Sequence, residues 1–163
     1  ISPNRGLQGC TKMKTEAQEN FVLAEARSIM LKRLRQPGGI VSNIGSIQQY
    51  LTMEYGALEV EQFGCMFLDR SYGLINHNRM FRGTVDSCAT YPREIAREAL
   101  LQNAVFVILI HNHPAHNPLP SADDISMTKR LQEILAVLDI ALFDHIIVAG
   151  PNLHSMRTAG HLT

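Results

Sequence analysis

One stretch decides the fold of this chain: Val105-Phe106-Val107-Ile108-Leu109-Ile110, followed at once by His111-Asn112-His113-Pro114. An uninterrupted apolar run rich in β-branched residues predicts a strand that is buried on both faces of a covered sheet. His111 is the first polar side chain after the run, so we expect it to emerge where the strand ends. The following loop leads to a helix start at Ser121, and a crevice between a strand end and a helix start is a usual place for chemistry.

The polar residues around this strand end match the ligands of a zinc ion. His111 and His113, with Asp124 downstream, can offer two imidazole nitrogens and one carboxylate oxygen. Catalytic zinc sites use three such protein ligands and leave the fourth position to water. Zinc lowers the pKa of a water that it binds until that water becomes a nucleophile at neutral pH. The pattern therefore predicts a zinc-dependent hydrolase.

The same residues also have structural interpretations. Alternate residues of any strand share a face, so a His-x-His pair alone is weak evidence for a metal. Ser121, followed three residues later by Asp124, is typical of a helix N-terminus, with Ser121 as the N-cap and Asp124 in the first turn. The two interpretations are compatible, because a carboxylate has two oxygens.

Helices and strands alternate along the rest of the chain. We expect helices over 15–35, 46–55 with Ser46 as its cap, 92–103 and 121–139, and strands over 62–69, 73–84 and 141–148 in addition to the run before His111. The first helix should be amphipathic, with Phe21, Leu23, Ala24, Ile29, Met30 and Leu34 on its apolar side. No structure is predicted for 155–163. This mixed order favours an α/β fold, a single-domain α/β/α sandwich with a mixed sheet.

Several ordered motifs together resemble the JAMM (MPN) metalloprotease family, and its bacterial RadC-like branch most closely. The motifs are His111 to Pro114, Ser121 to Asp124, Asp144-His145-Ile146-Ile147, Phe67-Leu68-Asp69, Phe81-Arg82-Gly83-Thr84 and Pro92-Arg93-Glu94-Ile95. The resemblance covers roughly residues 45 to 160. It implies a JAMM/MPN domain of cytidine-deaminase-like architecture over 45–163, preceded by an arm and helix over 1–44.

The resemblance also implies roles for individual residues. The family has an upstream glutamate that acts as general base, and Glu61-Gln62-Phe63 matches its Glu-x-Phe pattern, although Glu59 is a nearby competitor. Zn²⁺ would be held by His111, His113 and Asp124, and Ser121 would donate a hydrogen bond to the developing oxyanion. Amide or isopeptide hydrolysis is the implied reaction, on a peptide or isopeptide-linked substrate that the residues do not specify.

Charge and composition bear on the alternatives. Family members are often labelled DNA-repair proteins, but the net charge is +0 and the one dense basic cluster, Lys32, Arg33 and Arg35, suits a helix C-terminus. DNA is therefore a weaker expectation, and an intact ligand set argues against a catalytically silent binding module. The chain resembles the version of RadC without the upstream helix-hairpin-helix module. Three scattered cysteines and the lack of a membrane-spanning apolar stretch favour a cytoplasmic protein.

The remaining histidines carry weaker signals. His116 replaces a small residue in the loop after His113, so we expect its ring at the rim of the site, close to the metal but outside its ligand set. His145 is expected to orient its neighbours or to pack. His77, His154 and His161 have no informative spacing and are expected to be exposed.

Overall fold

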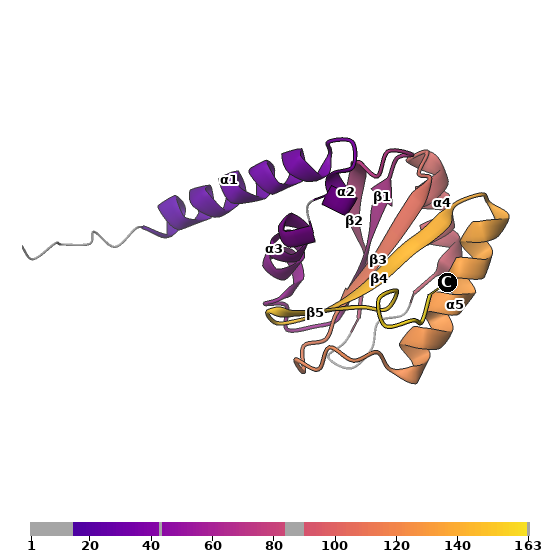
Figure 1. Ribbon diagram of the computed structural model, residues 1–163. Helices are drawn as coiled ribbons and strands as arrows, with labels where there is room; N and C mark the ends of the chain where they lie inside the picture. Colours follow the sequence, from indigo (N-terminus) through magenta and orange to yellow (C-terminus); the bar gives the residue numbers. More distant parts are fainter. Residues whose placement is uncertain (1–14, 43, 84–89, 163) are drawn as a thin grey trace, which may run out of the picture.

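The computed structural model describes residues 15–42, 44–83 and 90–162. These residues form three layers, a five-stranded sheet between two groups of helices (Figure 1). The elements are α1 (Glu16–Leu34), α2 (Gly39–Ser42), α3 (Ile44–Tyr55), β1 (Gln62–Leu68), β2 (Leu74–Arg82), α4 (Pro92–Leu101), β3 (Phe106–Asn112), α5 (Ala122–Val137), β4 (Ala141–Ala149) and β5 (Asn152–Ser155). The predicted α/β class with a mixed sheet is confirmed.

The strand that contains His111 lies in the middle of the sheet. The strand order is β2-β1-β3-β4-β5, with β3 and β4 parallel and the other pairs antiparallel. A parallel pair needs a crossover, and α5 provides it. Every residue of β3 from Val107 to Asn112 is buried. The start of α5 is thereby brought back to the end of β3 where His111 lies.

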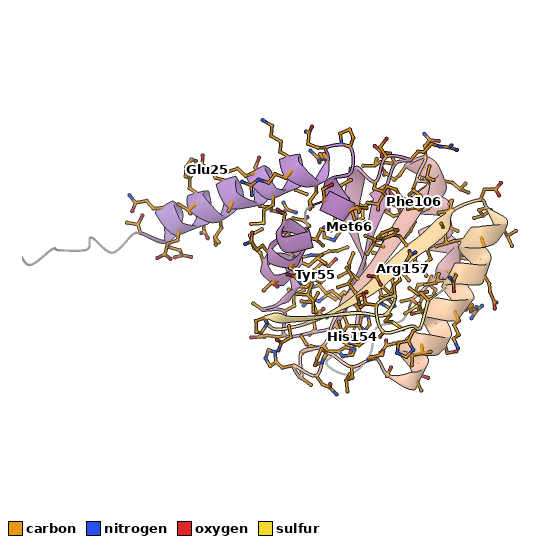
Figure 2. The ribbon with its side chains drawn as sticks, viewed as in Figure 1. Glu25, Tyr55, Met66, Phe106, His154 and Arg157 are labelled. Atoms are coloured by element: carbon orange, nitrogen blue, oxygen red, sulfur yellow. The ribbon has the colours of Figure 1, made fainter. Side chains whose placement is uncertain are left out.

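Alternate residues of β1 pack into two separate cores. Cys65 and Phe67 face α4 and α5, whereas Met66 and Leu68 face α2 and α3. Figure 2 shows the second of these layers, where Tyr55 of α3 lies near Met66 of the sheet. Cys65 is fully buried, whereas Cys10 and Cys88 lie outside the described residues.

Helix α1 differs from its prediction. Its N-terminus is well formed, because Thr15 makes a capping box with Gln18. The helix then projects beyond the rest of the fold (Figure 1), and Phe21, Leu23 and Ile29 are 63%, 54% and 53% exposed. The predicted apolar face is therefore wrong for most of its length, since periodicity shows that a face exists but not that another element covers it.

Three boundaries also differ. Ser46 lies inside α3, which begins at Ile44, and the short helix α2 precedes it. Strand β2 ends at Arg82, and residue 84, the last of the expected strand, lies outside the described residues. A fifth strand, β5, pairs with the end of β4. Within the described ranges, no helix has both the length and the apolarity to cross a membrane.

A candidate metal centre at the end of β3

Three side chains with metal-binding atoms meet where β3 ends and α5 begins. His111 is the last residue but one of β3, His113 directly follows the strand, and Asp124 lies in the first turn of α5. Their ligand atoms all lie within 4.8 Å of one another. The Nε2 atom of His111 is 2.8 Å from Nε2 of His113 and 3.2 Å from Oδ1 of Asp124, and Nε2 of His113 is 3.6 Å from Oδ2.

The proton on His113 can be placed from its surroundings. Its Nδ1 atom lies 2.7 Å from the carbonyl oxygen of Asn117. A carbonyl only accepts hydrogen bonds, so Nδ1 must carry the proton, and the neutral ring presents a lone pair at Nε2. That lone pair points toward the carboxylate of Asp124 and toward His111. Electron pairs that converge in this way attract a cation, and neutral imidazole with carboxylate is a zinc donor set.

The electrostatics of the centre also favour a cation. Burial opposes ionisation of Asp124, but its interactions with His111, His113 and Ser121 outweigh burial and hold the pKa of this carboxyl well below its usual range. The Asp124 carboxylate raises the pKa of His113, because it would accept a hydrogen bond from the protonated ring. An ionised carboxylate therefore stays ready to bind a metal ion, and protons compete with the metal for His113.

Ser121 caps α5 and orients Asp124 at the same time. Its backbone N and its Oγ donate to Oδ2 of Asp124 at 2.8 and 2.6 Å, and the backbone N of Asp124 donates to Oγ at 3.1 Å. The predicted helix N-terminus is confirmed. The one hydroxyl proton of Ser121 is bound to the carboxylate, so the role of oxyanion donor stays a prediction that requires this hydroxyl to turn.

A cleft of about 750 Å³ opens over these side chains. Glu61, at the start of β1, lines the cleft together with His111, His113, Ser121 and Asp124. Its charge is among those that raise the pKa of His113, after the hydrogen bond to Asp124 and the opposing burial. Glu59 is exposed and is not among the described residues that line the cleft. Position thus favours Glu61 over its competitor.

Asn112 holds the segment of Glu61 in place, and sequence reasoning missed it. Its side chain is 1% exposed, on the strand face opposite to the two histidines. Oδ1 accepts from the backbone N of Gln62 at 2.8 Å, and Nδ2 donates to the carbonyl of Val60 at 3.1 Å. A polar residue at the end of a buried strand must find such partners, and that was the only signal in the sequence.

His145 lies behind His111, on the side away from the cleft. Its Nε2 is 2.7 Å from Nδ1 of His111, and its Nδ1 is 2.6 Å from Oγ1 of Thr128 on α5. Complete burial lowers the pKa of His145 well below its ordinary value, so the ring is neutral. This position agrees with the expectation that His145 orients a neighbour. Thr128 was not singled out, because a threonine inside a helix has no distinctive spacing.

The expected position of His116 is wrong. Its backbone has a φ of 58°, and it is absent from the described residues that line the cleft. The ring instead packs on Gly150, where an added Cβ would lie 2.7 Å from Nδ1. With this left-handed backbone, the side chain lies against the turn between β4 and β5.

The other histidines are not exposed as expected. His77 is half-buried between two tyrosines, with ring nitrogens 2.7 Å from the hydroxyl of Tyr50 and 2.8 Å from that of Tyr55. Tyr55 can reach it because Gly64 has no side chain; a Cβ there would collide with the tyrosine hydroxyl. His154 and His161 are half-buried as well.

Comparison with known proteins agrees with this description. The α/β/α fold, with His-x-His and Asp meeting at the end of a central strand, agrees with a JAB-type domain. The family model of the RadC-like JAB domain matches residues 41–161. The chain belongs to the RadC-like JAB family.

Relatives that carry only a family designation are found in several bacteria. The UPF0758 protein of Cupriavidus pinatubonensis is 40% identical over 157 residues, which make up 96% of this chain and 68% of that protein. A UPF0758 protein of a Janthinobacterium species is 40% identical over 146 residues, 90% of this chain and 65% of its own length. The UPF0758 protein YkfG of Escherichia coli is 34% identical over 145 residues, 89% of this chain and 92% of its own length. The chain thus spans about two thirds of the first two relatives.

Proposed function

We propose that this chain is a zinc-dependent hydrolase that cleaves an amide or isopeptide bond with an activated water. The observation that carries the proposal is the convergence of three metal-binding side chains, His111, His113 and Asp124, in a cleft that Glu61 also lines. A bound zinc ion would supply Lewis acidity to a carbonyl and would acidify a water molecule.

The residues of the chain would then divide the remaining work. Glu61, at the start of β1, would accept a proton from the attacking water and deliver it to the departing amine. Asn112 would keep the Glu61 segment against the end of β3 through its bonds to Gln62 and Val60. Ser121 would hold Asp124 in its ligand orientation and, if its hydroxyl turns, would donate to the oxyanion.

The competing function is DNA processing of the RadC type. The net charge of +0 gives this chain no general attraction to phosphates. The exposed basic residues at the end of the projecting helix α1 are Lys32, Arg33 and Arg35. None of them is among the described residues that line the cleft. The amide-hydrolase proposal therefore ranks first.

Zinc content provides the first test. The purified protein should hold about one zinc per chain, because three protein ligands and a water complete a tetrahedral site. His113→Ala should lose most of it, and His116→Ala, in the same loop but turned toward Gly150, should keep it. Elemental analysis after dialysis measures all three. Equal zinc in wild type and His113→Ala would refute the ligand set.

A substrate screen provides the second test. The zinc-loaded protein would be incubated with peptides, isopeptide-linked conjugates and DNA of single- and double-stranded form. Cleavage of an amide or isopeptide bond that stops with a chelator and returns with zinc is the expected result. Zinc-dependent cleavage of DNA alone would favour the competing function.

A further inference from the structure

We propose that Thr128 and His145 form a hydrogen-bonded chain that fixes which nitrogen of His111 is free to bind the metal. The proposal rests on the function proposed above, because it concerns the same centre. Neither residue touches the cleft; both are 0% exposed, behind His111. They would be positioning residues, acting on the metal through His111.

Thr128 determines in which direction the hydrogen bonds of this chain are donated. Its Oγ1 lies 2.6 Å from the backbone carbonyl oxygen of Asp124, one turn earlier in α5. Two oxygens this close must share a proton, and a carbonyl has none to give. The hydroxyl of Thr128 therefore donates to Asp124. The sulfur of Met156, 3.6 Å away, is a weaker acceptor and does not compete with this bond.

The proton on His145 follows from that bond. Oγ1 of Thr128 has only one hydrogen, which is already used, so it can only accept from Nδ1 of His145 at 2.6 Å. His145 is 0% exposed, and burying a charged ring is costly, so the ring carries a single proton and that proton is on Nδ1. Its Nε2 is left with a lone pair.

The same reasoning applies to His111, the proposed metal ligand. Nε2 of His145 accepts from Nδ1 of His111 at 2.7 Å, so His111 carries its proton on Nδ1. Its Nε2, which faces Asp124 and His113, keeps the lone pair that a metal needs. If every bond in the chain were reversed, that proton would lie on Nε2 of His111 and would block the metal.

One residue thus serves the centre twice. The carboxylate of Asp124 is a proposed ligand, and its backbone carbonyl is the fixed acceptor at which the chain begins. His113 reaches the same state by a shorter route, through the carbonyl of Asn117. Partners that orient a ligating histidine typically raise metal affinity by about 10- to 100-fold.

The affinity test uses a matched set of threonine variants. Thr128→Val keeps the shape of the side chain but removes the hydroxyl, and Thr128→Ser keeps the hydroxyl. Thr52→Val makes the same change in α3, on the other face of the sheet. Competition with a chromophoric chelator should show zinc binding weakened about 10- to 100-fold in Thr128→Val and within about threefold of wild type in the other two. Unchanged affinity in Thr128→Val would overturn the proposal.

The main result of a second measurement needs neither zinc nor a variant. Imidazole ¹⁵N shifts of the wild-type protein report which nitrogen of His145 carries the proton. We expect the proton on Nδ1 both with and without zinc, and a shift toward the Nε2 form in Thr128→Val. A proton on Nε2 of His145 in the wild type would contradict the proposed hydrogen-bonded chain. If the protein binds no zinc while His145 still carries its proton on Nδ1, the proposed function is wrong. The hydrogen-bonded chain from Thr128 to His111 is then still supported.

Discussion

At the scale of single residues, the centre consists of polar groups whose partners leave them little freedom. The carbonyl of Asn117 decides the proton of His113, and the hydroxyl of Ser121 decides which oxygen of Asp124 faces His111. These two bonds are short, 2.7 and 2.6 Å, and each fixes the atom that its residue presents to the centre. Substitutions at this scale should therefore have large and separable effects.

Substitution of Glu61 should separate catalysis from metal binding. Glu61→Gln should keep its zinc but lower hydrolysis by about 10²- to 10⁴-fold, because an amide cannot accept the proton of the attacking water. Glu59→Gln is the matched control, since that side chain is exposed and outside the described lining of the cleft. Zinc stoichiometry and turnover of the substrate found in the screen measure both effects. Loss of zinc in Glu61→Gln would make Glu61 a ligand instead.

Asn112 should matter for stability as well as for the site. Asn112→Leu keeps the volume but leaves the N–H of Gln62 and the carbonyl of Val60 without their partner, which should cost about 2–3 kcal/mol. Asn20→Leu, on the exposed surface of α1, should change stability by less than about 0.5 kcal/mol. Urea unfolding followed by circular dichroism compares the two. Equal losses would show that the Asn112 bonds contribute little.

At the scale of elements, the turn after β4 and the loop after β3 depend on each other. Gly150 has a φ of +59°, and the ring of His116 occupies the space where its side chain would be. Both positions are left-handed, so each favours glycine. This contact explains why His116 is not among the described residues that line the cleft, although its neighbours in the sequence are.

A double-mutant cycle tests this contact. Gly150→Ala should destabilise the protein by about 1–2 kcal/mol from the backbone alone, with a further cost from the collision with the ring. His116→Gly should remove that further cost in the double variant and should keep full zinc content. Thermal unfolding of the four proteins gives the coupling between the two sites. Purely additive effects would contradict the packing of His116 on Gly150.

At the scale of the whole molecule, a buried histidine outside the centre makes stability depend on pH. Burial between Tyr50 and Tyr55 lowers the pKa of His77 to about 4, from an ordinary value of 6.5. Between these two values the unfolded chain binds more protons than the folded protein, so acidification favours unfolding. From pH 7 to pH 5 this group should remove about 2 kcal/mol of stability.

The contribution of His77 is measured as a difference between two proteins. His113 has a raised pKa and acts in the opposite sense, so the total change with pH is not specific to one residue. Urea unfolding of metal-free wild type and His77→Gln, each at pH 7 and pH 5, isolates the contribution of His77. The variant should lose about 2 kcal/mol less on acidification. Parallel losses in the two proteins would place the effect elsewhere.

Binding to DNA is also a property of the whole chain. With a net charge of +0, binding to plain duplex should be weaker than about 1 μM at physiological salt and should fall steeply as salt rises. Fluorescence anisotropy with a labelled duplex, titrated at several salt concentrations, measures this. Nanomolar binding at physiological salt would promote the DNA-processing function over amide hydrolysis.

The sequence by itself determined the features that depend on neighbours along the chain. An apolar, β-branched run such as Val105 to Ile110 can be buried only as an internal strand, and a Ser-x-x-Asp start is enough to begin α5. Because a strand places alternate residues on one face, the shared direction of His111 and His113 also followed. The fold class and the candidate ligands were therefore predictable.

Only the tertiary structure decided which residues face one another across elements. The partners of Asn112 lie about 50 residues away and those of His145 lie on β3 and α5, so no local pattern indicates them. The same holds for the exposure of α1 and for the turn of His116 toward Gly150. Periodicity states which side of an element is apolar or polar, but only packing states what covers that side.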